Sequence, residues 1–346
     1  MNPTTIYTVV FSPTGTSKRV AAAVAQGLAR CSGICNAPEN TAAAVTAAAG
    51  SVAANAVAEN TDAAASGMNA GTETGNGADA SSSSSAGTII GTGKTGNGNA
   101  VKPFTTIDLT HTAGKSVTLP ADAAAVFAVP VYGGRVAPAA LERLQKIRGE
   151  GTPAVVLAVY GNRAFGTAVA QLAAFVAERG FVPVAAGAFV GEHSYSTPGT
   201  PIAEGRPDAQ DLADTTAFGV RIGEKLAHGQ TRPIDAAKLR EPHTPLLSKL
   251  RFIRFVLGYR RRQKRSPVVL LPAGDAARCT QCGRCVALCP TQAIARGDEL
   301  HTDPARCIRC CACVKGCAFG ARTFETPFAA VLSRNFARRK PPVTIM

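Results

Sequence analysis

The chain has 346 residues, 46% of them hydrophobic, and a net charge of +14 at pH 7, which allows two domains with a sizeable core. No run reaches the ~18 uncharged apolar residues of a spanning helix, and the first residues, MNPTTIYTVVF, lack a secretory signal pattern, so we expect a cytoplasmic protein. The positive charge favours acidic partners, whereas the absence of tryptophan and of aromatic residues interleaved with the basic ones disfavours nucleic acid.

The chain begins with a predicted strand at residues 5–11 and a predicted helix at residues 19–30. Between them lies the hydroxyl-rich loop SPTGTSK, residues 12–18. Backbone N–H groups and the helix dipole favour an anion there, and hydroxyl groups add donors without adding charge. The loop lacks both the G-x-G-x-x-G of dinucleotide sites and the lysine pattern of triphosphate sites, so it predicts a monophosphate site.

Residues 31–102 differ in composition from the rest of the chain. They contain no aromatic residue and few charges, so they cannot bury enough apolar surface to offset the entropy of ordering, and we predict a disordered insertion. Its GTGKT, residues 91–95, is similar to a phosphate-binding loop, but the pattern requires glycine where this chain has Thr88, and we interpret the match as chance. Cys31 and Cys35 are interpreted as incidental thiols.

After the insertion, apolar runs alternate with helical segments. Strands are expected at residues 104–109, 124–130, 154–160 and 182–190, and helices at 137–147, 164–179 and 208–226. Such alternation is typical of a parallel sheet covered on both faces. We therefore predict an α/β fold, a doubly wound five-stranded parallel sheet formed by residues 1–30 and 103–228.

A basic linker is predicted at residues 229–274. Within it, residues 245–265 (PLLSKLRFIRFVLGYRRRQKR) form an amphipathic pattern. One interpretation is a helix that contacts a membrane surface or an acidic partner. The other is a linker helix that docks one domain on the other, with its charges in solvent. The apolar positions are Leu246, Leu250, Phe252, Ile253 and Leu257.

Nine of the 11 cysteines lie between Cys279 and Cys317, in two C-x2-C-x2-C-x3-C runs followed by Pro290 and Ala318. Thiolates at these steps converge on one face of a cuboidal cluster, and the fourth ligand must come from the other run because the local chain cannot wrap all sides. We therefore predict two [4Fe-4S] clusters with crossed ligands. Cluster 1 is assigned to Cys279, Cys282, Cys285 and Cys317, and cluster 2 to Cys307, Cys310, Cys313 and Cys289.

Two alternatives remain within the cysteine runs. Zinc ribbons also use C-x2-C pairs, although zinc gives no role to the central third cysteine of each run. Cys311 stands where the first run has Gly283, and a cluster needs no fifth thiol. It is either a small buried residue or an alternative ligand or redox-active thiol.

The tandem cysteine runs, residues 277–322, resemble the bacterial two-cluster ferredoxin module, a small α+β domain expected at residues 275–325. The first loop resembles that of the flavodoxin family, whose [ST]-x-T-G-x-[ST] holds the phosphate of FMN. The matching positions are Ser12, Thr14, Gly15, Thr16 and Ser17. The combination is similar to the flavodoxin-ferredoxin fusion proteins of anaerobic bacteria. That pattern does not include residues 31–102, and residues 326–346 are expected to be a C-terminal tail.

The resemblance implies a flavodoxin-like sheet in the order 2-1-3-4-5, with FMN at the carboxyl ends of its strands. Two further loops would then lie beside the flavin ring, and in both a tyrosine precedes a glycine. They contain Pro130, Val131, Tyr132, Gly133 and Gly134, and Tyr160, Gly161, Asn162 and Arg163. Arg163 either stabilises reduced flavin or is solvated, and His193 in the loop Glu192–Ser194 either contacts the flavin or is a polar surface residue.

We expect an electron-transfer iron-sulfur flavoprotein, because FMN exchanges one or two electrons and each cluster exchanges one. One alternative is a flavin-dependent reductase of a small organic or quinone-like substrate, fed by its own ferredoxin module. Another is a zinc-binding regulatory module. The expected partners are an acidic redox protein or a small-molecule acceptor, with peripheral membrane contact as a further interpretation of the basic helix.

Overall fold

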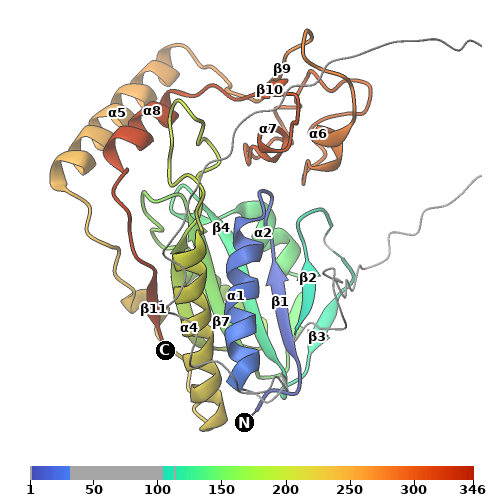
Figure 1. The fold of residues 1–346 in the computed structure, drawn as a ribbon, viewed down its shortest axis with the longest axis vertical. Helices are drawn as coiled ribbons and strands as arrows, with labels where there is room; N and C mark the ends of the chain where they lie inside the picture. The colour runs from blue at the N-terminus through green and yellow to red at the C-terminus, as the bar shows by residue number, and fades with distance from the viewer. Residues whose placement is uncertain (1, 32–103, 113) are drawn as a thin grey trace, which may run out of the picture. The chain divides into compact units, whose positions relative to one another are not determined.

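The computed structural model describes residues 2–31, 104–112 and 114–346. Nearly all of the predicted insertion, with Cys35 and residues 91–95, therefore lies outside the described residues. All described residues belong to one compact unit of the chain. Figure 1 shows its central sheet with helices packed against it.

Five parallel strands form the sheet in the order β2-β1-β4-β7-β8. This is the 2-1-3-4-5 order of a flavodoxin-like doubly wound sheet, which confirms the predicted fold class. In the described part of the chain, the sheet has seven strands and not the predicted five, because β5 and β11 also join it. Every residue of the central strand β7 is buried, as expected of an apolar strand covered on both faces. The strands are β1 (Ile6–Val10), β2 (Thr105–Asp108), β4 (Ala124–Tyr132), β7 (Thr152–Tyr160) and β8 (Phe181–Val190).

Two pairs of helices bury the two faces of the sheet. The helices α1 (Thr16–Cys31) and α4 (Ala209–Ala227) share one core cluster with it, and α2 (Pro138–Leu144) and α3 (Ala168–Ala177) share the other. The helices α1 and α4 cross closely because Gly27 and Gly219 lack side chains: an added Cβ would lie 2.1 Å from Thr216 O and 2.2 Å from Val24 O, respectively. Asp208 caps α4 by accepting a hydrogen bond from the backbone of Asp211.

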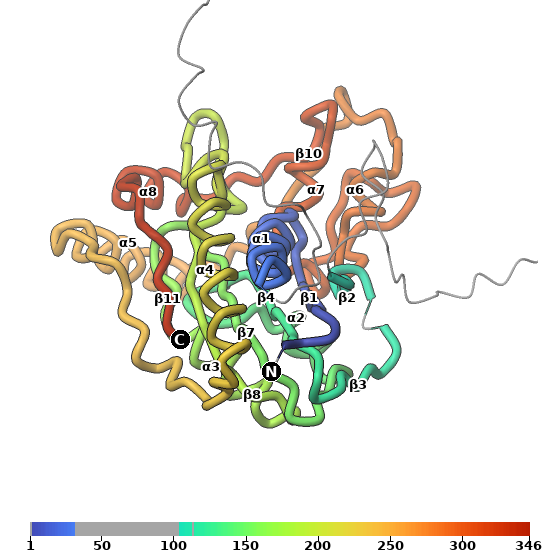
Figure 2. Tube along the Cα trace, turned by 60° about the horizontal axis from the view of Figure 1, so that its bottom comes forward, coloured from blue at the N-terminus to red at the C-terminus, as the bar shows by residue number. Residues whose placement is uncertain are grey.

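The expected C-terminal tail, residues 326–346, forms helix α8 (Pro327–Asn335) and strand β11 (Val343–Ile345). Strand β11 pairs antiparallel with β8 and extends the seven-stranded sheet at that edge. Figure 2 shows the red C-terminal segment returning from α8 to this edge. Three very short strands lie between β2 and β7 in the sequence: β3 (Val117–Leu119), β5 (Arg135–Val136), which pairs with β4, and β6 (Ile147–Gly149), which pairs with β3. The 3-10 turn η1 (Ala236–Lys238) follows α4.

The basic segment forms helix α5 (Leu246–Arg265), none of whose residues is fully buried. Its Phe255 and Tyr259 pack edge-on against Phe328 of α8, with ring centroids 5.1 and 4.9 Å away. Among the described helices, none has the length and apolar character required to cross a membrane. The cysteine-rich part follows, with short elements β9 (Ala273–Gly274), α6 (Arg284–Ala287), α7 (Ala312–Lys315) and β10 (Arg322–Thr323).

Candidate functional site

The hydroxyl-rich loop turns directly into helix α1. Gly15 has φ +81°, and its N–H donates to Ser12 O at 3.0 Å, which closes the turn. Ser12 Oγ accepts from Lys18 N at 3.0 Å, whereas the Lys18 amine pairs with Asp108 at 2.9 Å. The Ser17 hydroxyl is fully buried and has no partner among the described residues. A buried donor without a partner beside the free N–H groups of a helix N-terminus fits a bound phosphate.

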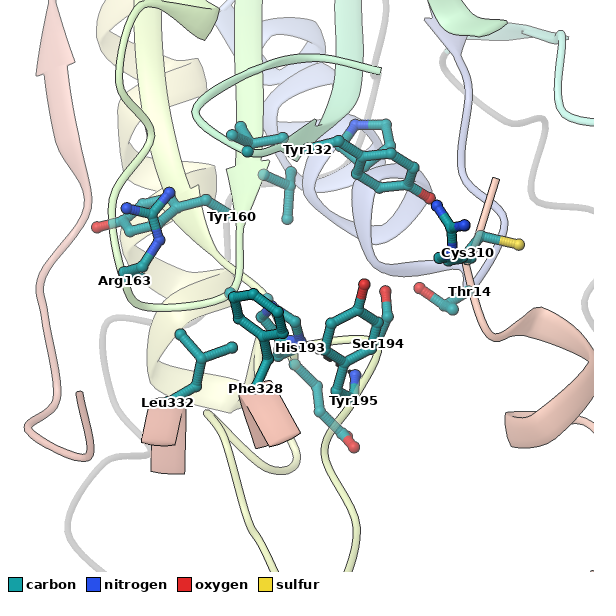
Figure 3. Close-up of a pocket in the computed structure, with 18 of the residues that line it drawn as sticks. Thr14, Tyr132, Tyr160, Arg163, His193, Ser194, Tyr195, Cys310, Phe328 and Leu332 are labelled. Carbon is teal, nitrogen blue, oxygen red and sulfur yellow. Dashed lines mark hydrogen bonds between the residues drawn. The ribbon is translucent and has the colours of Figure 1, made fainter. Parts of the chain in front are cut away.

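A cavity of about 660 Å³ opens above this loop. Figure 3 shows side chains from several parts of the chain around it, among them Thr14, Tyr132, His193, Cys310 and Phe328. Of the fourteen residues predicted to contact FMN, eleven line the cavity, and Gly15, Gly134 and Asn162 do not. The eleven are Ser12, Thr14, Thr16, Ser17, Pro130, Val131, Tyr132, Gly133, Tyr160, Gly161 and Arg163.

The two predicted tyrosines occupy different environments. Tyr132 is half-buried at the end of β4, and burial raises the pKa of its hydroxyl well above the usual value, with a further increase from Cys310 and Cys311. Tyr160 is only 2% exposed and packs edge-on against Phe165, with ring centroids 5.6 Å apart. Tyr132 therefore offers the more accessible ring to a bound flavin, while Tyr160 belongs mainly to the hydrophobic core.

Gly161 and His193 meet at the floor of the cavity. A Cβ added to Gly161 would lie 2.2 Å from Cδ2 of His193, so the imidazole ring can lie here only beside a glycine. His193 Nδ1 accepts from Tyr195 N at 3.0 Å, which leaves the other ring nitrogen as the donor of the neutral form. Burial, and then the charges of Arg163 and Lys315, lower the His193 pKa to about 4. The side chain is therefore a neutral hydrogen-bond donor near neutral pH.

Gly134 and Asn162 have structural contacts outside the cavity. Gly134 O accepts from Thr167 N at 2.9 Å, at the start of α3. Asn162 is buried, and its Nδ2 donates to Phe336 O at 2.6 Å and to Arg338 O at 2.9 Å. Asn162 therefore holds the C-terminal segment beside the cavity. The backbone of Arg163 makes a second contact with the same segment, since Lys340 Nζ donates to Arg163 O at 2.7 Å.

The eight predicted cluster ligands line two separate cavities. One is lined by Cys279, Cys282, Cys285 and Cys317, and the other by Cys289, Cys307, Cys310 and Cys313, with Cys311 beside them. These are the two groups that the sequence analysis assigned to cluster 1 and cluster 2. In the part of the chain that the structure describes, no three His, Cys, Asp or Glu side chains are placed to hold a single metal ion. Each group of four thiols instead lines a cavity.

The two cysteine loops have the same backbone conformation. Gln281 and Arg309 have φ +53° and +55°, and Gly283 and Cys311 have φ +71° and +57°. In each loop, the second of these residues is the N-cap of a short helix, α6 or α7. Cys311 therefore holds a left-handed position that glycine holds in the first loop, and it is 1% exposed. Repeated left-handed residues turn backbone N–H groups toward one concave surface, which suits an anionic iron-sulfur cluster.

Hydrogen bonds and charges act on several of the thiols. Burial raises the pKa of Cys317, but backbone N–H groups of Arg322, Ala321, Phe319 and Gly320 outweigh it and lower the pKa below the usual value. In the second group, burial raises the pKa of Cys310 to about 12. Cys289 Sγ accepts from Ala293 N at 3.1 Å. Hydrogen bonds to sulfur of this kind are among the factors that set cluster potentials.

The cysteine-rich part contacts the α/β domain through two ionic side chains. Arg143 of α2 donates to Leu109 O at 2.7 Å and also to Pro290 O in the cysteine-rich part. Lys315 of α7 forms an ion pair with Glu192 and donates to Ser196 O at 2.7 Å. The first contact joins Pro290, next to Cys289, to helix α2, and the second joins α7 to the loop after β8.

The phosphate-loop cavity and the second thiol cavity share part of their walls. Ile308 and Cys310 line both of them. A predicted cluster ligand therefore borders the predicted flavin site, and only this short segment separates the two spaces. Groups bound in the two cavities would therefore lie close together.

Several lining residues were missed by sequence reasoning. They come from the loop after β8, from helices α5 and α8 and from the second cysteine loop, and their places depend on long-range packing. The spacing of Phe252, Phe255 and Tyr259, three and four residues apart, could have predicted an aromatic face on α5. The missed residues are Tyr195, Phe252, Val256, Tyr259, Arg260, Ile308, Arg309, Phe328 and Leu332.

A comparison with protein families found a match in the cysteine-rich part. Residues 272–318 match the family model of the 4Fe-4S dicluster domain. No curated protein matches the chain. Among solved structures, the flavodiiron protein from Giardia intestinalis is similar with a TM-score of 0.26 and 14% identity, over 66% of this chain and 37% of that protein. The chain thus spans little more than a third of that protein's length, and similarity at this level indicates no function. The chain combines a flavodoxin-like α/β sheet with a segment similar to iron-sulfur dicluster domains, an architecture that supports a role in electron transfer.

Proposed function

We propose that the protein is an electron-transfer iron-sulfur flavoprotein with one FMN and two [4Fe-4S] clusters, in the manner of a flavodoxin-ferredoxin fusion. The phosphate of FMN would lie on the loop of Ser12, Thr14, Thr16 and Ser17. FMN supplies one- or two-electron chemistry and each cluster supplies one-electron chemistry. Ile308 and Cys310 carry the proposal, because they line the flavin cavity and the second thiol cavity at once.

The two thiol groups differ in their access to solvent. In the second group, Cys310 and Cys313 are buried, whereas Cys282 of the first group is exposed. A cluster near the surface is suited to exchange with an external protein, and a buried one to exchange within the chain. We therefore assign contact with an external redox partner to the side of cluster 1.

The surface around cluster 1 has the character of a docking site for an acidic protein. Phe319, which lines this thiol cavity, is 53% exposed. Arg278, Arg284 and Arg296 lie exposed in the same part of the chain. Exposed arginines in the same part of the chain as an exposed apolar side chain suit an acidic redox protein, because complementary charge speeds encounter.

Composition and redox behaviour test the proposal together. Anaerobically purified protein should contain about eight iron atoms per chain, acid-labile sulfide and one FMN. An optical and EPR redox titration should resolve flavin and cluster transitions. Protein with neither flavin nor iron would refute the proposal, and colourless protein containing zinc would support a zinc-binding regulatory module.

The apolar wall of the flavin cavity favours a second candidate, a reductase of a small organic or quinone-like substrate. Phe252 and Tyr259 of α5 and Phe328 of α8 line the cavity on the side of these helices. Neutral His193 and the cation Arg163 would supply polar contacts to a carbonyl or quinone oxygen. Steady turnover of a quinone by reduced protein, abolished by bulky substitution of Val256, would favour this candidate over a carrier.

A further inference from the structure

Helix α5 has two apolar faces, and only one of them is packed. Phe252, Phe255 and Tyr259 face α8, where Phe252 meets Phe336 with ring centroids 5.4 Å apart. Leu250, Ile253 and Leu257 are each 52% exposed, and Leu246 is 70% exposed. Residues 246, 250, 253 and 257 are spaced four, three and four apart, so they form one stripe along the helix.

The exposed stripe is exceptional for this molecule. Seven of the nine exposed large hydrophobic side chains in the described part of the chain lie within residues 246–269. They include Leu247 at 65%, and Val268 and Val269 just after the helix at 56% and 61%. Scattered apolar residues are normal on a surface, whereas a continuous row marks an interaction surface.

The charge of α5 indicates what this surface contacts. Its 20 residues include eight Lys or Arg and no Asp or Glu. No ion pair in the described residues involves any of these eight cations. On a helical wheel, Lys249 and Arg260 flank one side of the leucine stripe, and Arg254 and Arg261 flank the other.

We propose that α5 binds the surface of membranes that contain anionic lipids, independently of the proposed redox function. Over its length of about 30 Å, the leucine stripe would enter the boundary between headgroups and acyl chains while the flanking cations contact lipid phosphates. An apolar row between two cationic rows matches this layered surface. An acidic protein would satisfy the cations but would give no reason for leucines along the whole helix.

Vesicle binding by the full-length holoprotein tests the proposal. Wild-type protein should co-sediment with vesicles of phosphatidylcholine and phosphatidylglycerol, bind vesicles of phosphatidylcholine alone far more weakly, and dissociate at high salt. The triple variant R254Q/R261Q/R265Q should bind about 100-fold more weakly, since each cation near an anionic surface contributes about 1 kcal/mol. The control R148Q/R232Q/R240Q removes equal charge from exposed sites elsewhere and should bind nearly as wild type.

Insertion of the stripe has its own readout. The natural chain contains no tryptophan, so L257W provides a single reporter whose emission should shift to shorter wavelength on anionic vesicles. In contrast, R148W should show no shift. The variant L250S/I253S/L257S keeps every charge and should lose most vesicle binding, with its visible absorption spectrum unchanged.

Three results would overturn the proposal. The first is failure of the wild-type protein to bind anionic vesicles. If that protein binds polyglutamate instead, α5 would be assigned to an acidic protein partner. The second is dimerisation that depends on the leucines and occurs without vesicle binding, which would assign the stripe to a second copy. The third is full vesicle binding by L250S/I253S/L257S.

Discussion

Replacing Gly161 with alanine should weaken flavin binding through its effect on His193. The added Cβ would lie 2.2, 2.7 and 2.8 Å from three atoms of His193, whereas ordinary contact begins near 3.4 Å. The φ angle of Gly161 is not positive, so alanine adds no backbone strain of that kind. The imidazole ring must therefore move, and its position at the floor of the cavity is lost.

Overpacking a closely filled site costs about 1–3 kcal/mol, which corresponds to a roughly 5- to 150-fold increase in the Kd for FMN. The assay is fluorescence titration of flavin-free protein with FMN, with the free energy of unfolding measured in parallel. G199A is the matched control, because a Cβ there meets nothing within 4 Å and Gly199 has no positive φ. G199A should bind FMN as wild type does.

The double variant G161A/H193A tests whether a loss of FMN affinity in G161A arises from displacement of His193 or from the added methyl group itself. If the methyl group acts by displacing His193, adding G161A to H193A should cost much less than adding it to wild type. Wild-type FMN affinity in G161A, or an equal loss of affinity in both backgrounds, would show that the methyl group does not act through His193.

Three further predictions concern the thiols and His193. C317S should remove only the cluster whose other ligands are Cys279, Cys282 and Cys285, lowering iron from about eight to about four atoms per chain; an EPR loss confined to the other cluster would contradict the crossed assignment. C311G should keep all iron and change the free energy of unfolding by only about 1 kcal/mol. Glycine adopts the left-handed conformation of Cys311 without strain, and this gain offsets the lost burial of the sulfur. Loss of iron would make Cys311 a ligand. The His193 pKa is about 4 when folded and 6.5 when unfolded, so its contribution to stability is complete above pH 6.5 and lost as pH falls toward 4. Urea denaturation should therefore show about 2 kcal/mol more loss between about pH 7 and pH 5 in wild type than in H193N, and an equal loss in both would contradict the assignment.

The sheet could be predicted from the sequence because its strands are long apolar runs. Residues 154–160 predict a buried strand, and β7 (Thr152–Tyr160) contains it. The strands β3, β5 and β6 have only two or three residues each, too few for a periodic signal. Strand β11 could not be predicted, since Val343–Ile345 becomes a strand only by pairing with β8, more than a hundred residues earlier.

The candidate site was predictable only where a local pattern carries the chemistry. The loop of residues 12–18 and the two cysteine runs each combine residue type with fixed spacing. By contrast, α5 lines the cavity with only one of its two apolar faces, and the periodicity of the sequence does not predict which face packs against the rest of the protein. The leucines that suggested docking in the sequence are exposed, while Phe255 and Tyr259 make the contact.

A stopped-flow experiment can follow electron transfer from the clusters to the flavin. Wild-type protein would be mixed anaerobically with a reduced acidic one-electron donor protein, and flavin absorbance would be followed beside that of C317S, which retains the flavin cavity. Flavin reduction should be rapid in wild type and much slower in C317S, because the exposed cluster receives the electrons. Equal rates in the two proteins, or wild-type clusters that are reduced while the bound flavin stays oxidised, would contradict it.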